Sequence, residues 1–200
     1  MTPELTITII VIVIFFAVLL IIIKPLKNYF YRRFFRQSYY QNIKKLVNKK
    51  DYRLINNFYF KIDELTQAHF DHLIFGEKYI YAITDKYWKM GIFGKPQDES
   101  WLLYKTDKKR IYIDNPLQKN ELRIEKLSLI SGIDRDMFVT IVLTNNDCVC
   151  DETLVLNNKN VIIKQKNLTK LILKYENSSI NKINEEQLQK VIYDLNSLKF

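Results

Sequence analysis

The sequence predicts an α/β domain with a mixed β-sheet flanked by helices, preceded by one transmembrane helix. Three observations support this prediction: an uncharged apolar run near the N-terminus, a series of short β-rich segments, and helical periodicity before and after those segments. The 200 residues are about one domain's worth, and the hydrophobic (48%) and charged (26%) fractions exclude a wholly disordered or fibrous chain.

Residues 5–23 form the apolar run and contain no charged residue, glycine or proline. A helix of that length would reach ~28 Å, which matches the hydrocarbon core of a bilayer. A cleaved signal peptide is the alternative, but it usually has a basic start and a small-residue cleavage site. Here Glu4 precedes the run and Lys24-Pro25 follows it. We therefore expect residues 1–24 to be a retained transmembrane helix with a short extracytoplasmic tail.

The net charge of +9 is concentrated beside this run. Residues 24–53 contain ten Lys/Arg and one acid, whereas residues 54–200 contain 21 Lys/Arg and 20 acids. The positive-inside rule then predicts a single-pass protein of the cell membrane, with its N-terminus outside and its soluble domain in the cytoplasm. Two unpaired cysteines, Cys148 and Cys150, agree with a reducing compartment.

Residues 25–38 mix aromatic and basic side chains and are predicted to be a juxtamembrane segment. Rings at headgroup depth and cations on anionic lipid suit this composition, although nucleic acid could use the same residue types. The cations expected at the membrane interface are Lys24, Lys27, Arg32, Arg33 and Arg36.

The remaining elements alternate between helix and strand, which predicts a mixed sheet of about five or six strands. Strands are expected at residues 58–62, 70–75, 79–84, 101–104, 110–113, 138–144 and 161–163, with a hairpin turn at 76–78. Helices are expected at residues 39–50, from Asn115-Pro116 onward, at 167–175 and at 184–197.

Five short motifs follow one another along the predicted domain. They are Asp71-His72, Thr84-Asp85-Lys86, Gly91-Ile92-Phe93-Gly94, Trp101, and Asn115-Pro116-Leu117-Gln118-Lys119-Asn120. Each motif alone is weakly specific, but their order and spacing resemble the NERD (nuclease-related) domain family over about residues 40–145. We therefore assign residues 39–145 to a NERD-like domain, and residues 146–200 to a C-terminal extension that packs on it.

The resemblance implies a restriction-endonuclease-like fold with a metal site of the PD-(D/E)XK kind. In such a site an Asp and a Glu hold Mg²⁺, and a Lys two residues after the Glu stabilises the attacking water. Asp71 then matches the first metal ligand and Lys86 matches the catalytic lysine. The Glu position is Thr84, and the further Glu of the first helix would fall near Tyr40, so the catalytic motif is degenerate.

Other readings of these site residues remain open. Asp85 could act as a relocated metal ligand, but strand alternation points it away from Thr84 unless a bulge intervenes. Asp71 and Lys86 could instead form a structural ion pair, because one carboxylate and one cation do not make a strong Mg²⁺ site. His72 alternates away from Asp71 and is better explained as a structural residue.

The other motif residues also have structural interpretations. The glycines suit a turn, the tryptophan suits the core, and Asn-Pro suits the start of a helix. Candidate phosphate contacts are the turn residues Lys108, Lys109 and Arg110, and Arg123, which stands where the family usually has a histidine. The motif residues themselves are Gly91, Gly94, Trp101, Asn115, Pro116, Gln118 and Asn120.

These observations favour a membrane protein whose cytoplasmic NERD-like domain binds or processes DNA or RNA and is catalytically weakened or inactive. One alternative is an active Mg²⁺-dependent nuclease with relocated metal ligands. Another is a non-enzymatic module that holds an unknown protein partner at the membrane. Residues 146–200 contain no motif that adds to this choice, and their closing helix is expected to be a packing or partner face.

Overall fold

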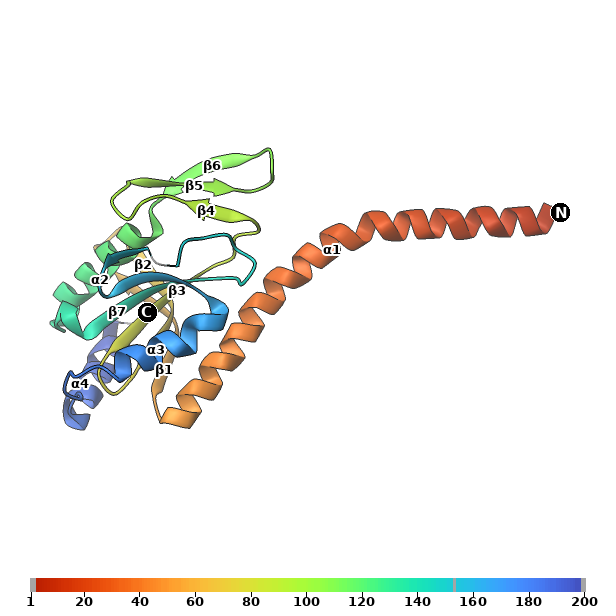
Figure 1. The fold of residues 1–200 in the computed structure, drawn as a ribbon. Helices are drawn as coiled ribbons and strands as arrows, with labels where there is room; N and C mark the ends of the chain where they lie inside the picture. Colours follow the sequence, from red (N-terminus) through yellow and green to blue (C-terminus); the bar gives the residue numbers. More distant parts are fainter. Residues whose placement is uncertain (1–2, 153, 199–200) are drawn as a thin grey trace. The chain divides into compact units, whose positions relative to one another are not determined.

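A computed structural model describes residues 3–152 and 154–198 of the chain (Figure 1). The chain forms two compact units, residues 1–41 and 42–200. The first unit consists of most of helix α1, and the second contains both β-sheets and the other helices. Each unit is described by itself.

Helix α1 (Pro3–Lys50) is continuous, so the helix predicted at residues 39–50 is its last part and the predicted start is wrong. Pro25 lies inside α1 without ending it, although proline removes one backbone donor. The helix is long and apolar enough to cross a membrane, and none of its most apolar window is buried in the protein. A signal sequence would have the same length and composition, whereas the core helix of a soluble protein would be mostly buried.

Most of the predicted membrane-interface cations can be located on α1. Lys27, Arg33 and Arg36 are exposed, and the Lys27 ammonium lies 5.7 Å from the centre of the Tyr31 ring. The side chains of Lys24 and Arg32 lie outside the described residues.

The main sheet has six strands in the order β1-β2-β3-β7-β9-β8. β1, β2 and β3 pair antiparallel, β3, β7 and β9 pair parallel, and β8 returns antiparallel to β9. The predicted mixed sheet is therefore confirmed. The strands are β1 (Arg53–Lys61), β2 (Gln67–Phe75), β3 (Ile80–Lys86), β7 (Phe138–Thr144), β8 (Val155–Asn157) and β9 (Asn160–Lys164).

Helices cover both faces of this sheet. Ile124 of α2 and Leu195 of α4 are buried in one core cluster with apolar side chains of β1, β2 and β3. On the opposite face, the Tyr81 hydroxyl of β3 donates to the Glu176 carboxylate of α3 at 2.6 Å. The result is the three-layer α/β/α arrangement expected of the predicted fold class. The helices are α2 (Pro116–Ser131), α3 (Leu168–Glu176) and α4 (Glu185–Leu198), with short 3₁₀ turns η1 (Arg135–Met137) and η2 (Gln165–Asn167).

A second, smaller sheet contains β4 (Gly91–Phe93), β5 (Ser100–Tyr104) and β6 (Arg110–Asp114), and it is separate from the main sheet (Figure 1). The sequence analysis found β5 and β6 but did not separate them from the main sheet. Its inner face packs through Trp101 and Leu103 in a cluster with Leu117 of α2 and Val142 of β7.

The turn predicted at residues 91–94 is wrong, because Gly91–Phe93 is strand β4. Both glycines are explained by close packing. A Cβ at Gly91 would lie 3.0 Å from the Val149 carbonyl oxygen, and a Cβ at Gly94 would lie 2.2 Å from the Trp101 ring. These glycines let β4 approach its neighbours closely.

Candidate functional site

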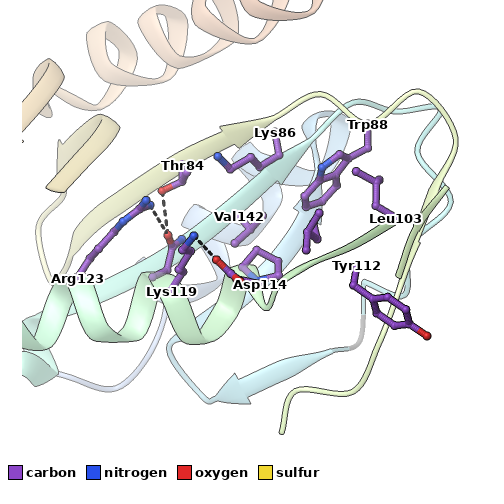
Figure 2. Close-up of a pocket in the computed structure, with 12 residues that line it drawn as sticks. Thr84, Lys86, Trp88, Leu103, Tyr112, Asp114, Lys119, Arg123 and Val142 are labelled. Atoms are coloured by element: carbon purple, nitrogen blue, oxygen red, sulfur yellow. Dashed lines mark hydrogen bonds and ion pairs between the residues drawn. The ribbon is translucent and has the colours of Figure 1, made fainter. Parts of the chain in front are cut away.

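A cleft of about 490 Å³ lies where the end of β3, the first turns of α2 and the small sheet meet (Figure 2). Its floor and one wall are apolar, with Trp88, Leu103 and Val142 among the lining residues. The polar side chains that line it are Thr84, Lys86, Asp114, Lys119, Asn120 and Arg123.

Asp71 occupies the place where the pairing of β2 with β3 ends. The ladder runs from Phe75 opposite Ile80 to His72 opposite Ile83. Asp71 precedes His72 on β2, just beyond the last backbone pair. Its carboxylate accepts the backbone N–H of Asp85 on β3 at 2.8 Å, so a side-chain contact takes the place of the next backbone hydrogen bond between the strands. This contact joins the Asp71 side chain to the backbone of Asp85, and neither residue is among those that line the cleft.

Besides this backbone hydrogen bond, the Asp71 and Asp85 carboxyl groups interact electrostatically. Burial and the neighbouring Asp85 raise the pKa of Asp71 to about 7, although the backbone N–H and Lys86 act in the opposite direction. A carboxyl pair of this kind shares a proton near neutral pH, because two adjacent buried carboxylates do not both ionise readily.

Two cations face this pair. Burial lowers the pKa of Lys86 and of Arg123, and in both cases the negative charge of Asp71 opposes the effect. The ion pairs between described residues do not include one between Asp71 and Lys86, so their interaction acts at longer range. The two cations are therefore held near carboxyl groups without being fully paired by them.

Thr84, which the sequence analysis expects at the position of a metal-binding Glu, lines the cleft. Its hydroxyl donates to the Asn120 side-chain oxygen at 3.0 Å, and the Arg123 guanidinium donates to the same oxygen at 3.3 Å (Figure 2). Asn120 thus orients both Thr84 and Arg123. Its own side-chain N–H₂ is buried and has no hydrogen-bond partner among the described residues.

These groups do not fit a strong Mg²⁺ site. Among the described residues, no three His, Cys, Asp or Glu side chains are close enough together to hold a metal ion. Neither Asp71 nor Asp85 lines the cleft, and Thr84 offers only a neutral hydroxyl that is already engaged with Asn120. Mg²⁺ prefers carboxylate and water oxygens, and nearby Lys86 and Arg123 add positive charge that opposes its binding.

The Asn-Pro motif positions the wall of the cleft. The Asn115 side-chain oxygen accepts the backbone N–H groups of Leu117 and Gln118, which confirms the predicted start of α2. The Asn115 side-chain N–H₂ donates to the carbonyls of Pro96 and Asp98, and Gln118 donates to the same two carbonyls. The motif therefore joins α2 to the loop between β4 and β5.

The other predicted residues lie outside the cleft lining. Trp101 is buried and its indole N–H donates to the Lys95 carbonyl at 2.8 Å, so it belongs to the core. The His72 ring nitrogen Nδ1 lies 2.6 Å from the Asn56 side-chain oxygen, and burial lowers the pKa of His72 to about 4. Lys108, Lys109 and Arg110 are exposed at the turn between β5 and β6.

Among the cleft-lining residues that sequence reasoning missed are Trp88, Asp114 and Tyr112, because no motif distinguishes them. The Trp88 backbone N–H donates to the Asn145 side chain, which fixes the chain just after β3. At the mouth, the Lys119 ammonium pairs with Asp114 at 2.5 Å, and both side chains are largely exposed. A solvated pair of this kind can exchange partners at little cost.

Comparison with protein families now adds to this geometry. Residues 32–145, more than half of the chain, match the model of the nuclease-related domain, NERD. The chain belongs to the NERD family. No curated protein and no solved structure gave a significant match. The matched range contains α2, the small sheet and strands β1, β2, β3 and β7, and therefore every residue that lines the cleft of this NERD domain.

The first prediction concerns the buried carboxyl pair. The pKa of Asp71 is raised in the folded protein, so its contribution to stability is greatest below pH 4 and is lost as pH rises to about 7. Asp71→Asn should therefore gain thermal stability relative to wild type between pH 5 and pH 8. The gain should be about 1 to 2 kcal/mol after allowance for solvent screening. The measurement is the unfolding midpoint of the full chain in detergent at both pH values.

Asp114→Asn is the control for this prediction. The Asp114 pKa is lowered by Lys119, so Asp114 stays ionised from pH 5 to pH 8 and its substitution should give a difference from wild type that does not vary with pH. An Asp71→Asn difference that is equally flat over this range would contradict the shared-proton interpretation.

Proposed function

We propose that this chain is a membrane-tethered NERD domain that binds the phosphate backbone of nucleic acid, DNA or RNA, and whose nuclease chemistry is weakened or lost. The observation that supports this most directly is the convergence of Lys86, Lys119 and Arg123 on one cleft. Only Lys119 is paired with a carboxylate at close range, and that pair is exposed. A phosphate entering the cleft could replace the Asp114 carboxylate at Lys119 and meet Arg123 from the same helix.

Arg123 is suited to phosphate because its planar guanidinium can donate two parallel hydrogen bonds to two oxygens. Its orientation by Asn120 reduces the conformational entropy that binding would cost. Arg123 is half-buried, which strengthens its attraction for an anion because water screens it less than it screens surface cations, whereas Lys86 is exposed. Apolar lining residues such as Trp88 and Val142 would contact the sugar or base.

The weakening of catalysis follows from the donor set. A PD-(D/E)XK site needs a carboxylate at the position of Thr84, and the structure has a hydroxyl bonded to Asn120 there. The second candidate function, a nuclease with relocated metal ligands, has one observation in its favour, since Asp71 and Asp85 are adjacent. We favour binding without cleavage because neither Asp71 nor Asp85 lines the cleft, and Asp71 interacts with the cations Lys86 and Arg123.

For the membrane tether, we propose that the apolar part of α1 crosses the cell membrane with its N-terminus outside and the NERD domain in the cytoplasm. The length and exposure of this helix support a span. The ten basic residues in the range 24–53 support this orientation. Anionic lipid is then the expected neighbour of the juxtamembrane cations, and an unknown protein partner remains the alternative occupant of the domain.

Salt-dependent binding tests the phosphate proposal. Full-length protein in nanodiscs should bind a labelled 16-nucleotide DNA or RNA, and its affinity should fall as salt rises. Arg123→Gln should weaken binding about tenfold at low salt and reduce the slope of log affinity against log salt by roughly one. Fluorescence anisotropy measures both quantities.

Lys126→Gln is a matched control, because Lys126 is an exposed cation one helical turn from Arg123 and does not line the cleft. It changes the net charge equally and should leave the affinity within about twofold. Equal losses in the two variants would mean that only bulk charge matters. Failure of the wild-type protein to bind at low salt would refute the proposed function.

The expectation that the site does not bind a metal strongly is tested by isothermal titration of Mg²⁺ and Mn²⁺ into the full chain in detergent. We expect no saturable binding in the micromolar to low-millimolar range, because the donor set lacks a third carboxylate and lies beside two cations. Saturable binding that disappears in Asp71→Ala would instead support the relocated-ligand nuclease, and cleavage assays on DNA and RNA would then decide its substrate.

The proposed orientation of the chain in the membrane is tested by trypsin treatment of membrane vesicles. Lys and Arg occur only from residue 24 onward, so the extracytoplasmic tail offers no cleavage site. We expect the chain to remain intact in right-side-out vesicles and to lose its domain in inside-out vesicles. The reverse pattern would place the NERD domain outside the cell.

A further inference from the structure

The outer face of the small sheet is exposed and aromatic, in contrast to its inner face. Strand alternation turns Trp101 and Leu103 of β5 toward the core, where both are buried. Leu102 and Tyr104 of the same strand therefore point outward. The inner face has the structural role already described, and the outer face has none.

Cross-strand pairing brings the outward side chains together. Phe93 of β4 lies opposite Leu102, and Leu102 lies opposite Tyr112 of β6, so these three form one row across the sheet. Tyr104 and Arg110 form the neighbouring row. The Phe93 and Tyr104 rings contact edge to face, with their centres 5.5 Å apart. Phe93 is 49% exposed and Tyr112 is 76% exposed.

Positive charge borders this aromatic face on one side. Arg110 is on the face itself, and the turn from β5 to β6 adds Lys105, Lys108 and Lys109 against one acid, Asp107. On the other side of the face is Asp114, which is paired with Lys119. The charge of the turn thus complements a polyanion, while the rings offer flat apolar surfaces.

The aromatic face is continuous with two hollows. Tyr112 lies at the rim of the cationic cleft, and Figure 2 shows its ring pointing away from the interior of that cleft. Phe93 and Tyr104 line a second, more apolar hollow of about 550 Å³ together with Met90 and Val149. A chain of nucleotides could therefore pass from the cleft across the sheet without leaving the protein surface.

We propose that the outer face of the β4–β5–β6 sheet binds single-stranded nucleic acid, with unpaired bases stacked on Tyr112, Phe93 and Tyr104 and the backbone following the β5–β6 turn. This inference rests on the proposed phosphate-binding function and names its substrate class. Exposed rings select single strands, because the bases of a duplex are already stacked on one another and are not available. The cations alone would accept either form.

An anionic membrane is the competing occupant, since it also attracts aromatic and basic residues. The continuity of the aromatic face with a cleft that contains the half-buried Arg123 favours nucleic acid. A flexible strand could contact Arg123 inside the cleft and the sheet at once, whereas a flat bilayer surface fits only the sheet.

The test compares a 16-nucleotide single strand with the duplex of the same sequence, by fluorescence anisotropy, on the full chain in phosphatidylcholine nanodiscs. Tyr112→Ala and Phe93→Ala should each weaken single-strand binding about tenfold, the range expected for the loss of one stacked base, and leave duplex binding within about twofold. Tyr193→Ala is the matched control, because Tyr193 on α4 is 75% exposed and lies on a different element. It should bind like wild type.

The outcomes separate the two proposals. Salt-dependent binding that Arg123→Gln weakens but Tyr112→Ala and Phe93→Ala do not would overturn the stacking inference and leave the phosphate proposal standing. No binding of either form would overturn both. Unchanged unfolding midpoints in the two alanine variants are needed for a loss of binding to count as lost stacking.

A Tyr112→Trp variant gives a direct readout. Its additional fluorescence, taken as the difference from wild type, should be quenched when the single strand is added. A blue shift on changing the nanodisc to phosphatidylserine without nucleic acid, combined with no quenching by the single strand, would identify the membrane as the occupant and overturn the proposal.

Discussion

The side chain of Asn115 joins two of the three parts that form the cleft, helix α2 and the small sheet. Its oxygen caps α2, the helix that presents Lys119 and Arg123, and its N–H₂ group donates to two carbonyls in the loop between β4 and β5. That loop leads directly into the small sheet, whose inner face packs on α2 and β7. Because Asn115 is buried and uses both ends of its amide, no other side chain of similar size could keep all of these contacts. Aspartate would cap the helix but lose the donors.

When a neutral residue replaces one active-site carboxylate in a nuclease fold, the balance of positive and negative charge in the site changes. In a PD-(D/E)XK site, acidic ligands and a metal together attract and activate the phosphate. On the proposed function, Thr84 takes the place of an acidic residue, so Lys86, Lys119 and Arg123 determine the potential of the cleft. The negative charge of Asp71 moderates that potential. The proposal therefore links the weak metal site to the direct binding of phosphate.

Several elements could be predicted from sequence because their signals are local. Strand β7 has its predicted boundaries, because a short, mostly apolar run of seven residues in an α/β fold usually forms a strand that is buried on both faces. The start of α2 follows from Asn-Pro, because the cap and the fixed proline φ act within four residues. Strand β4 was taken for a turn because its glycines resemble turn residues, whereas their cause is contact with Val149 and Trp101, distant in sequence. Local sequence patterns also could not show that β4, β5 and β6 form a sheet separate from the main sheet.

The sequence by itself determined the family, the apolar helix and the mixed sheet, because each depends on residue type and order along the chain. Only the tertiary structure decided that the Asp71 carboxylate accepts the backbone N–H of Asp85, because that contact joins two strands. The regular register of β3 keeps the predicted alternation, so Thr84 and Lys86 line the cleft and Asp85 does not. The tertiary structure likewise decided that Tyr112 and Phe93 share a face, and that Arg123 and Lys86 meet across one cleft. These proximities join residues far apart in the chain, and they arise from register and packing.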